Sequence, residues 1–249
     1  MERRRGGCLV CGRELVYSEK AREMTCVFCG KKEQSQASCR DGHYVCDACH
    51  ARKGLDVIRD FCRETKLRDP VAVAQRIMED PYIYMHGPEH HVLAGAALLA
   101  AFCNSGGQLD LEKALSLMEE RGSQVPGGAC GFWGCCGAGV SAGIYMSIVT
   151  GATPLGGRSW GLSNRMTARA LAAIGEIGGP RCCKRDTFTA IREAVDMTRE
   201  ELGVEMELPR KITCAFSEEN PQCRRGSCPY YQDADSISMS PRQPCSSIY

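Results

Sequence analysis

The sequence predicts a mainly α-helical protein that begins with a small cysteine-rich module. Two observations predict this fold class. Cysteine and histidine recur at metal-ligand spacings in the first 50 residues, and after residue 50 apolar residues recur at helical spacing between Asp, Gly and Pro signals. We therefore expect three regions: a metal-binding module over 1–50, a helical Cys/Gly-rich domain over 51–230, and a flexible Ser-rich tail over 231–249.

Composition argues against several classes of protein. The 31 basic and 30 acidic residues leave a formal net charge of +1, so nucleic-acid binding is not expected. The apolar stretch from Cys136 to Thr150 is too short and too glycine-rich to span a membrane. Eighteen cysteines without a secretory signal at the N-terminus favour metal ligation in a reducing cytoplasm over a disulfide framework.

The N-terminal module contains four pairs of potential metal ligands. The pairs are Cys8/Cys11, Cys26/Cys29, Cys39/His43 and Cys46/Cys49. Their spacing resembles that of zinc ribbons, and eight ligands suit two structural Zn²⁺ ions. The pairs could serve the two ions consecutively, or they could interleave as in a cross-brace. Such a module is also a common docking element, so a partner protein could bind here.

The helical domain is divided by clear start and stop signals. Asp69, Asp110 and Asp186 are placed as N-caps, and Gly203 is placed as a C-terminal stop. The segment from Pro88 is almost wholly apolar and should form a buried central helix. We expect helices over 51–65, 70–79, 88–104, 110–122, through the Gly-rich stretch after Cys136, and over 165–175 and 186–202, with a short strand over 211–216.

The glycine-rich helix requires a physical explanation. A glycine inside a helix costs roughly 1 kcal/mol relative to alanine. Gly139 and Gly143 lie one helical turn apart and leave a smooth face, where another backbone or a bulky cofactor could approach closely. A tightly packed helix with inert buried thiols would produce the same pattern.

Eight cysteines of the helical domain fall in three loops that also contain glycine or proline. They are Cys130, Cys135, Cys136, Cys182, Cys183, Cys214, Cys223 and Cys228. A cysteine followed by proline, as at Cys228-Pro229, is common among iron–sulfur ligands. We interpret these thiols as converging on one [4Fe–4S] cluster. Zinc ligation and a redox-active or sulfur-carrying thiol set are the alternatives.

Polar residues near the cysteines suggest catalytic and binding roles. His86, Glu89 and His91 cluster around a helix N-terminus, where imidazole and carboxylate groups could transfer protons, although a histidine there could simply cap the helix. Arg158, Ser159 and Asn164 precede a predicted helix and would suit a carboxylate or phosphate, although an exposed turn explains them as well. We expect the cluster to lie against the N-termini near Pro88 and Asn164.

These observations favour a metalloprotein that acts on a small polar or anionic substrate. A cluster iron without a protein ligand could act as a Lewis acid on a hydroxyl or carboxylate, in lyase-like chemistry, and sulfur transfer is a related possibility. A binding module is the competing interpretation. In that case the zinc knuckles dock a partner enzyme or RNA, and the later cysteines are structural or redox-active.

Two resemblances extend this interpretation. The His43-Tyr-Val-Cys-Asp-Ala-Cys-His50 knuckle, His86-Gly-Pro-Glu-His-His91 and the Cys-Cys pairs resemble an uncharacterised prokaryotic domain-of-unknown-function family. That resemblance implies anaerobic metabolism and gives no mechanism. The stretch from Gly128 to Gly143 with Cys214 and Cys223 resembles the α-domain of iron–sulfur-dependent L-serine dehydratases, which implies a [4Fe–4S] site. The Ser-Ser-His-Thr motif of those enzymes is absent.

Overall fold

The N-terminal module is built on a β-hairpin that places metal ligands at its ends. Strand β1 (Leu15–Thr25) pairs antiparallel with β2 (Lys32–Cys39), and the register shifts between Tyr17 and Arg22. Strand β1 ends directly before Cys26, and β2 ends on Cys39.

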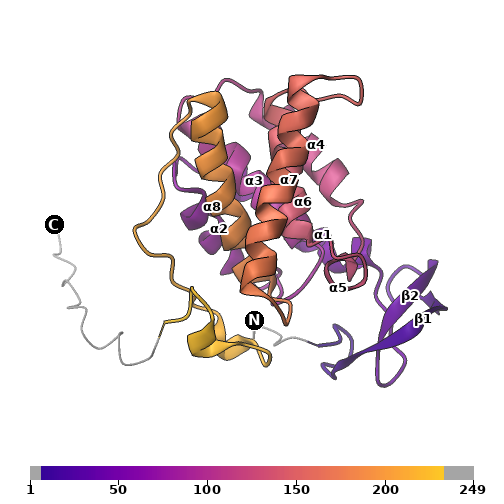
Figure 1. Ribbon diagram of the computed structural model, residues 1–249. Coiled ribbons are helices and arrows are strands. Elements are labelled where there is room, and N and C mark those ends of the chain that lie inside the picture. The colour runs from indigo at the N-terminus through magenta and orange to yellow at the C-terminus, as the bar shows by residue number, and fades with distance from the viewer. Residues whose placement is uncertain (1–6, 233–249) are drawn as a thin grey trace, which may run out of the picture.

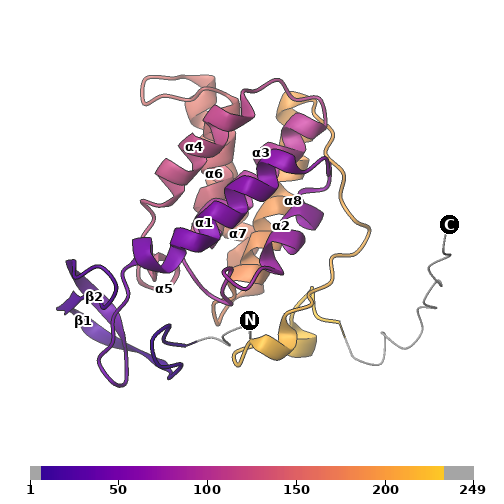
Figure 2. The same ribbon diagram turned by 180° about the vertical axis from the view of Figure 1, so that it is seen from behind.

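The computed structural model describes residues 7–232 (Figures 1 and 2), so nearly all of the predicted tail over 231–249 lies outside the described residues.

The described chain continues with eight α-helices and two short 3-10 turns. They are α1 (Asp47–Glu64), α2 (Pro70–Met78), α3 (His90–Asn104), α4 (Leu111–Gly122), α5 (Ala129–Phe132), α6 (Gly137–Val149), α7 (Arg158–Ile177), α8 (Cys183–Leu202), η1 (Ser217–Glu219) and η2 (Arg225–Ser227). The mainly helical fold class with a small N-terminal module is confirmed. Within residues 7–232, no helix has the length and apolar character that crossing a membrane requires.

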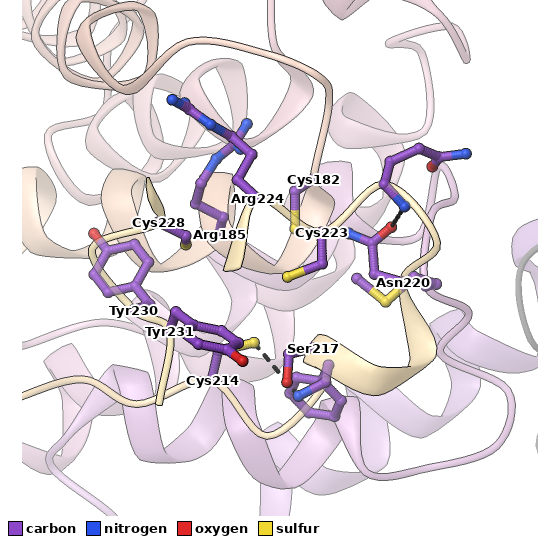
Figure 3. Close-up of a pocket in the computed structure, with 13 residues that line it drawn as sticks. Cys182, Arg185, Cys214, Ser217, Asn220, Cys223, Arg224, Cys228, Tyr230 and Tyr231 are labelled. Atoms are coloured by element: carbon purple, nitrogen blue, oxygen red, sulfur yellow. Dashed lines mark hydrogen bonds between the residues drawn. The ribbon is translucent and has the colours of Figure 1, made fainter. Parts of the chain in front are cut away.

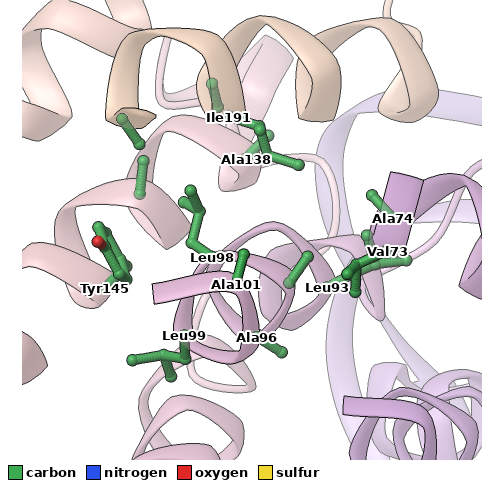
Figure 4. Packing of buried hydrophobic residues seen from close by; sticks show 14 of the residues in the cluster. Val73, Ala74, Leu93, Ala96, Leu98, Leu99, Ala101, Ala138, Tyr145 and Ile191 are labelled. Carbon is green, nitrogen blue, oxygen red and sulfur yellow. The ribbon is translucent and has the colours of Figure 1, made fainter. Parts of the chain in front are cut away.

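Helix α3 forms the centre of the bundle, as its apolar composition predicts. It contacts α1, α2, α4, α6 and α8, and all of its residues from Val92 to Phe102 are buried. Leu93, Leu98 and Leu99 project from it in different directions into the surrounding helices (Figure 4). A helix that is apolar on every side is stable only when other helices cover every side.

Small residues bring α6 very close to its neighbours. A Cβ atom added at Gly139 would lie 2.7 Å from Leu171 Cδ2 on α7. A Cβ atom added at Gly95 on α3 would lie 2.3 Å from Met118 Sδ, and the Gly95 N–H donates to Ser141 Oγ of α6 at 2.8 Å. The close approach that the glycines predict is therefore present, and the partners are protein helices rather than a cofactor.

Several helix ends agree with the expectations from the sequence. The Asp69 carboxylate accepts hydrogen bonds from the Val71 and Ala72 N–H groups at 2.8 and 3.1 Å, and α2 begins at Pro70. The Asp110 carboxylate caps α4 in the same way. Gly203 ends α8 with a φ of 67°, which glycine adopts without strain.

Other boundaries differ from the predictions, because tertiary contacts outweigh local signals. Helix α1 begins at Asp47, inside the last ligand pair, and α7 begins at Arg158 because Leu162 is buried in the bundle. Helix α8 begins at Cys183 rather than after Asp186. The predicted strand over 211–216 is wrong, because that segment is a loop with no strand beside it.

The close approach of α6 and α7 gives a stability prediction. Replacing Gly139 with leucine should destabilise the fold by roughly 1–3 kcal/mol or more, because the new side chain overlaps Leu171. The matched control is Gly175→Leu, at an exposed helical glycine on α7 where an added Cβ meets nothing within 4 Å. Urea unfolding of both variants measures the difference. Equal stability would show that the α6–α7 contact is looser than described.

Candidate metal centres and the cysteine pocket

The eight predicted zinc ligands form two separate groups of four. Within each group the ligand atoms all lie within 4.8 Å of one another. The groups are Cys8, Cys11, Cys39, His43 and Cys26, Cys29, Cys46, Cys49. The first and third pairs therefore share one site, and the second and fourth pairs share the other. This interleaved order is the cross-brace arrangement that the sequence left open.

The distances within both groups fit zinc. A tetrahedral ion with Zn–S bonds of ~2.3 Å requires sulfur atoms ~3.8 Å apart. Cys11 Sγ and Cys39 Sγ are 3.8 Å apart, and Cys29 Sγ and Cys46 Sγ are 3.7 Å apart. His43 Nδ1 lies 3.4 Å from Cys39 Sγ. The two groups can each hold a metal ion, and their donor atoms and spacing suit Zn²⁺. They are called the first zinc group (Cys8, Cys11, Cys39, His43) and the second zinc group (Cys26, Cys29, Cys46, Cys49) below.

Backbone N–H groups in the module point at the ligand sulfur atoms. Val10 N–H donates to Cys8 Sγ at 3.4 Å, and Cys46 N–H donates to Cys26 Sγ at 3.4 Å. Burial opposes ionisation of Cys26, but the backbone hydrogen bonds, led by that of Cys46, outweigh it and lower the pKa to about 6. These bonds stabilise the thiolate, which is the form that binds metal.

The second zinc group is joined directly to the helical domain. Its ligand Cys46 is the N-cap of α1, and the adjacent Asp47 carboxylate accepts the Gly127 N–H at 2.6 Å. His50 Nδ1 lies 3.3 Å from the buried Glu89 carboxylate. The metal group, the start of α3 and the glycine-rich loop before α5 are therefore held at one junction.

Four of the eight later cysteines line a single pocket. Cys182 at the start of α8 lines the same pocket as Cys214, Cys223 and Cys228 of the C-terminal segment, and this pocket is partly open to solvent. Figure 3 shows their side chains around this space. Arg185 and Arg224 also line the pocket. Their positive charges would stabilise a negatively charged thiolate-bound group.

The cysteines of the pocket receive hydrogen bonds like those in the zinc module. Phe216 N–H donates to Cys214 Sγ at 3.4 Å, and Arg225 N–H donates to Cys223 Sγ at 3.4 Å. Each donor lies two residues after its cysteine, as Val10 lies two residues after Cys8. The Asn220 amide is 3.7 Å from Cys182 Sγ. No motif in the sequence singles out Asn220.

The pocket nevertheless differs from the zinc groups in size. Within residues 7–232, three or more Cys, His, Asp or Glu ligand atoms lie within 4.8 Å of one another only in the two N-terminal groups. No three cysteines of the pocket satisfy that limit. One tetrahedral ion could not reach all four sulfur atoms as they stand, whereas the irons of a cluster bind their cysteines further apart.

The remaining four cysteines do not line this pocket, and the convergence of the three cysteine-containing segments on one centre stays a prediction. Cys182 is the N-cap of α8 and lines the pocket, whereas Cys183, the first residue of the helix, does not. Cys136 Sγ, at the start of α6, contacts Asp186 Oδ2 at 3.7 Å. Burial, Asp186 and Cys136 together raise the pKa of Cys183. Cys130 lies in the short helix α5, and Cys135 lies in the loop between α5 and α6.

The predicted catalytic residues have different environments. Glu89 Oε1 accepts the Tyr84 N–H at 3.1 Å and lies 3.5 Å from His90 Nδ1, so this carboxylate is held inside the fold. His91 Nδ1 pairs with the Val125 carbonyl oxygen at 2.9 Å. Both ring nitrogens of His86 are buried, and the side chains of Asn220 and Gln222 lie beside the ring. Burial and the nearby Arg181 lower the pKa of His86 to about 4, so the ring is neutral near pH 7.

The predicted anion-binding residues lie far from the cysteines. Arg158 begins α7 and pairs with Glu201 near the end of α8, at 3.0 Å. The start of α8 lies at the other end of that helix, roughly 27 Å away at 1.5 Å per residue. Figure 1 shows the α6–α7 loop and the C-terminal segment at opposite ends of the bundle. The expectation that Arg158, Ser159 and Asn164 border the cysteine site is wrong.

Comparison with known proteins gives a family without an activity. Residues 58–231 match the family described as "Family of unknown function (DUF5714)". The match includes all four cysteines of the pocket and excludes the eight zinc ligands. No curated protein and no solved structure matches the chain. None of these comparisons shows a link to the serine dehydratases.

The cross-brace predicts how the module responds to loss of one ligand. Cys26→Ser should release about one of two bound zinc ions and loosen the start of α1, because Cys26 and the N-cap Cys46 share one group. Metal analysis after dialysis measures the loss, and Cys103→Ser in α3 is the control. A Cys26→Ser protein that keeps both ions would contradict the assignment.

Proposed function

Because the chain belongs to the DUF5714 family, whose function is unknown, we propose its role from its own residues. Cys182, Cys214, Cys223 and Cys228 hold a [4Fe–4S] cluster, and the protein transfers electrons through it. The observation that carries this proposal is the single pocket in which these four cysteines face one another. The two zinc groups have a supporting role in the fold.

The shape and hydrogen bonding of the pocket support a cluster rather than a third zinc ion. The same chain has two groups with the compact spacing that zinc requires, and the pocket lacks this spacing. Its N–H···S bonds are the kind that stabilise cluster sulfur atoms and tune the reduction potential. Arg185 and Arg224 favour the additional negative charge of a reduced cluster.

The number of cysteines favours electron transfer over lyase chemistry. Lewis-acid catalysis requires one iron that is open to substrate, but four thiolates provide a ligand for each of four irons. Lyase-like action on a small polar substrate would therefore require one cysteine to leave its iron. His86 would then be the proton acceptor, because its ring is neutral near pH 7 and lies beside Asn220 and Gln222, which line the pocket.

A partner-binding role for the zinc module is the second candidate. Val27 and Phe28, between the ligands Cys26 and Cys29, are 47% and 59% exposed. Large apolar side chains at such exposure are more consistent with a contact surface than with a purely structural knuckle. A redox partner docked there would lie beside the helical domain.

Iron reconstitution tests the cluster. The purified chain, treated anaerobically with iron and sulfide, should bind about four irons and show a broad band near ~400 nm. Cys214→Ser and Cys228→Ser should each lose most of this band, because each removes a thiolate of the pocket. Cys103→Ser, outside the pocket, should retain it. Wild-type protein that binds a third zinc and no iron would contradict the proposal.

A further inference from the structure

The residues around the cysteines of the pocket carry charge of one sign. Within three positions of any of these four cysteines, the chain has basic residues and no acidic residue. The zinc ligands differ, because residues of both signs surround them, such as Arg40 and Asp41 directly after Cys39. The positive charge is therefore a feature of the pocket. The basic residues concerned are Arg181, Lys184, Arg185, Lys211, Arg224 and Arg225.

Four of these basic side chains reach solvent. Lys184 and Arg185 are buried, and Arg185 Nε lies 2.9 Å from the Asp186 carboxylate, which balances its charge. The four that reach solvent are called the cationic rim: Lys211 and Arg225 are exposed, and Arg181 and Arg224 are half-buried.

The cationic rim has no carboxylate partners. Within residues 7–232, none of its four side chains forms an ion pair, whereas Arg40 of the zinc module pairs with Glu14 at 3.0 Å. Solvent and salt screen exposed charges, so the rim contributes little to the stability of a buried cluster. The summed field of such charges instead attracts an oppositely charged partner and speeds its association.

The backbone holds Arg225 directly beside the pocket. Its N–H donates to Cys223 Sγ at 3.4 Å, and its carbonyl oxygen accepts the Cys228 N–H at 2.7 Å. Its φ is 48°, in the left-handed region that few residues other than glycine adopt, and the next residue, Gly226, would fit there with less strain. The chain therefore keeps a positive charge at this point between two cysteines.

An exposed aromatic surface continues from the rim toward the zinc module. The guanidinium carbon of Arg181, the residue before Cys182, lies 5.3 Å from the centre of the Tyr17 ring, and Tyr17 contacts Phe132 with ring centroids 6.3 Å apart. Tyr17, Phe132 and Trp133 are 46%, 47% and 70% exposed. Aromatic residues and arginine are enriched in protein–protein interfaces, so this composition favours a protein partner.

We propose that the cationic rim and this aromatic surface are the docking site of an acidic protein that carries a one-electron centre. The inference rests on the proposed function, because the partner exchanges electrons with the proposed cluster. One electron passes from the reduced carrier to the oxidised cluster, so the carrier is oxidised, the cluster is reduced, and no bond or proton moves. Docking at the rim places the carrier beside Cys182 and Cys223, which are the ligands next to Arg181 and Arg224.

A nucleic acid is the other polyanion that a positive surface could attract. Nucleic-acid binding that is strong at physiological salt rests on roughly six to ten phosphate contacts. The cationic rim has four basic side chains, and the whole chain has a formal net charge of +1. A carrier protein needs less positive charge than this, because a few charges suffice to steer a transient encounter. The observations therefore favour the acidic protein.

Reduction of the cluster by two donors tests the docking site on the full, reconstituted chain under anaerobic conditions. The donors are reduced plant-type ferredoxin, an acidic [2Fe–2S] protein, and reduced methyl viologen, a small cation that a positive surface does not attract. Between about 50 and about 500 mM NaCl, the second-order rate with ferredoxin should fall roughly 10-fold, whereas the rate with viologen should not fall. A ferredoxin rate that does not respond to salt overturns the proposal.

Matched variants locate the docking site. Arg225→Gln and Lys211→Gln should each lower the ratio of the ferredoxin rate to the viologen rate roughly 3-fold at low salt, and the double variant should lower it roughly 10-fold. The ratio cancels any change in the cluster itself. The control is Arg192→Gln, which removes the same charge from an exposed position roughly 14 Å along α8 from its first residue, and it should keep the wild-type ratio. An equal fall in the control overturns the rim.

Binding of oxidised ferredoxin, measured by titration calorimetry at low salt, distinguishes failure of this proposal from failure of the proposed function. If the chain binds no iron but binds ferredoxin, and Arg225→Gln weakens the binding, the cluster fails and the docking site stands. If viologen reduces a bound cluster while ferredoxin neither binds nor reduces it, the docking site fails alone. Displacement of ferredoxin by poly(U) RNA that binds more tightly would identify a nucleic-acid surface and would also overturn the proposal.

Discussion

The close packing of α6 against α3 and α7 determines where the chemistry of this protein can lie. Gly139 and Gly95 leave no room for a side chain, so these helices can approach only with glycine at the contacts. Helices α6, α7 and α8 then run alternately up and down, which brings the starts of α6 and α8 to the same end of the bundle (Figures 1 and 2). Cys136 and Cys183, which lie in those starts, are therefore at the same end of the bundle.

The zinc module contributes to the same end of the molecule. Tyr17 of β1 lies beside Phe132 with ring centroids 6.3 Å apart, and its ring also faces Arg181 before α8. The buried Glu89 lies between His50 of the module and His90 of α3. A buried carboxylate is costly without such partners. The order of this region therefore depends on the folding of the module, which a metal ion bound in each ligand group would stabilise.

The chain uses its cysteines in three different ways. The N-terminal ligands lie close enough for single ions, four cysteines surround a larger pocket, and Cys136 contacts a carboxylate. Residue type is identical in all three cases. The distance between sulfur atoms and the identity of their neighbours distinguish the two compact ligand groups from the larger pocket and from the thiol that contacts Asp186.

The sequence alone determined the helical class, the eight candidate metal ligands and the capped helices α2 and α4, because spacing and capping are local properties of the chain. It could not determine the pairing of ligands, which requires the hairpin to bring Cys39 beside Cys11. Nor could it separate Cys182 from Cys183, or place Arg158 at the far end of the bundle. Those features depend on how each helix is oriented relative to its neighbours. Only the packing of α3, α6, α7 and α8 sets these orientations.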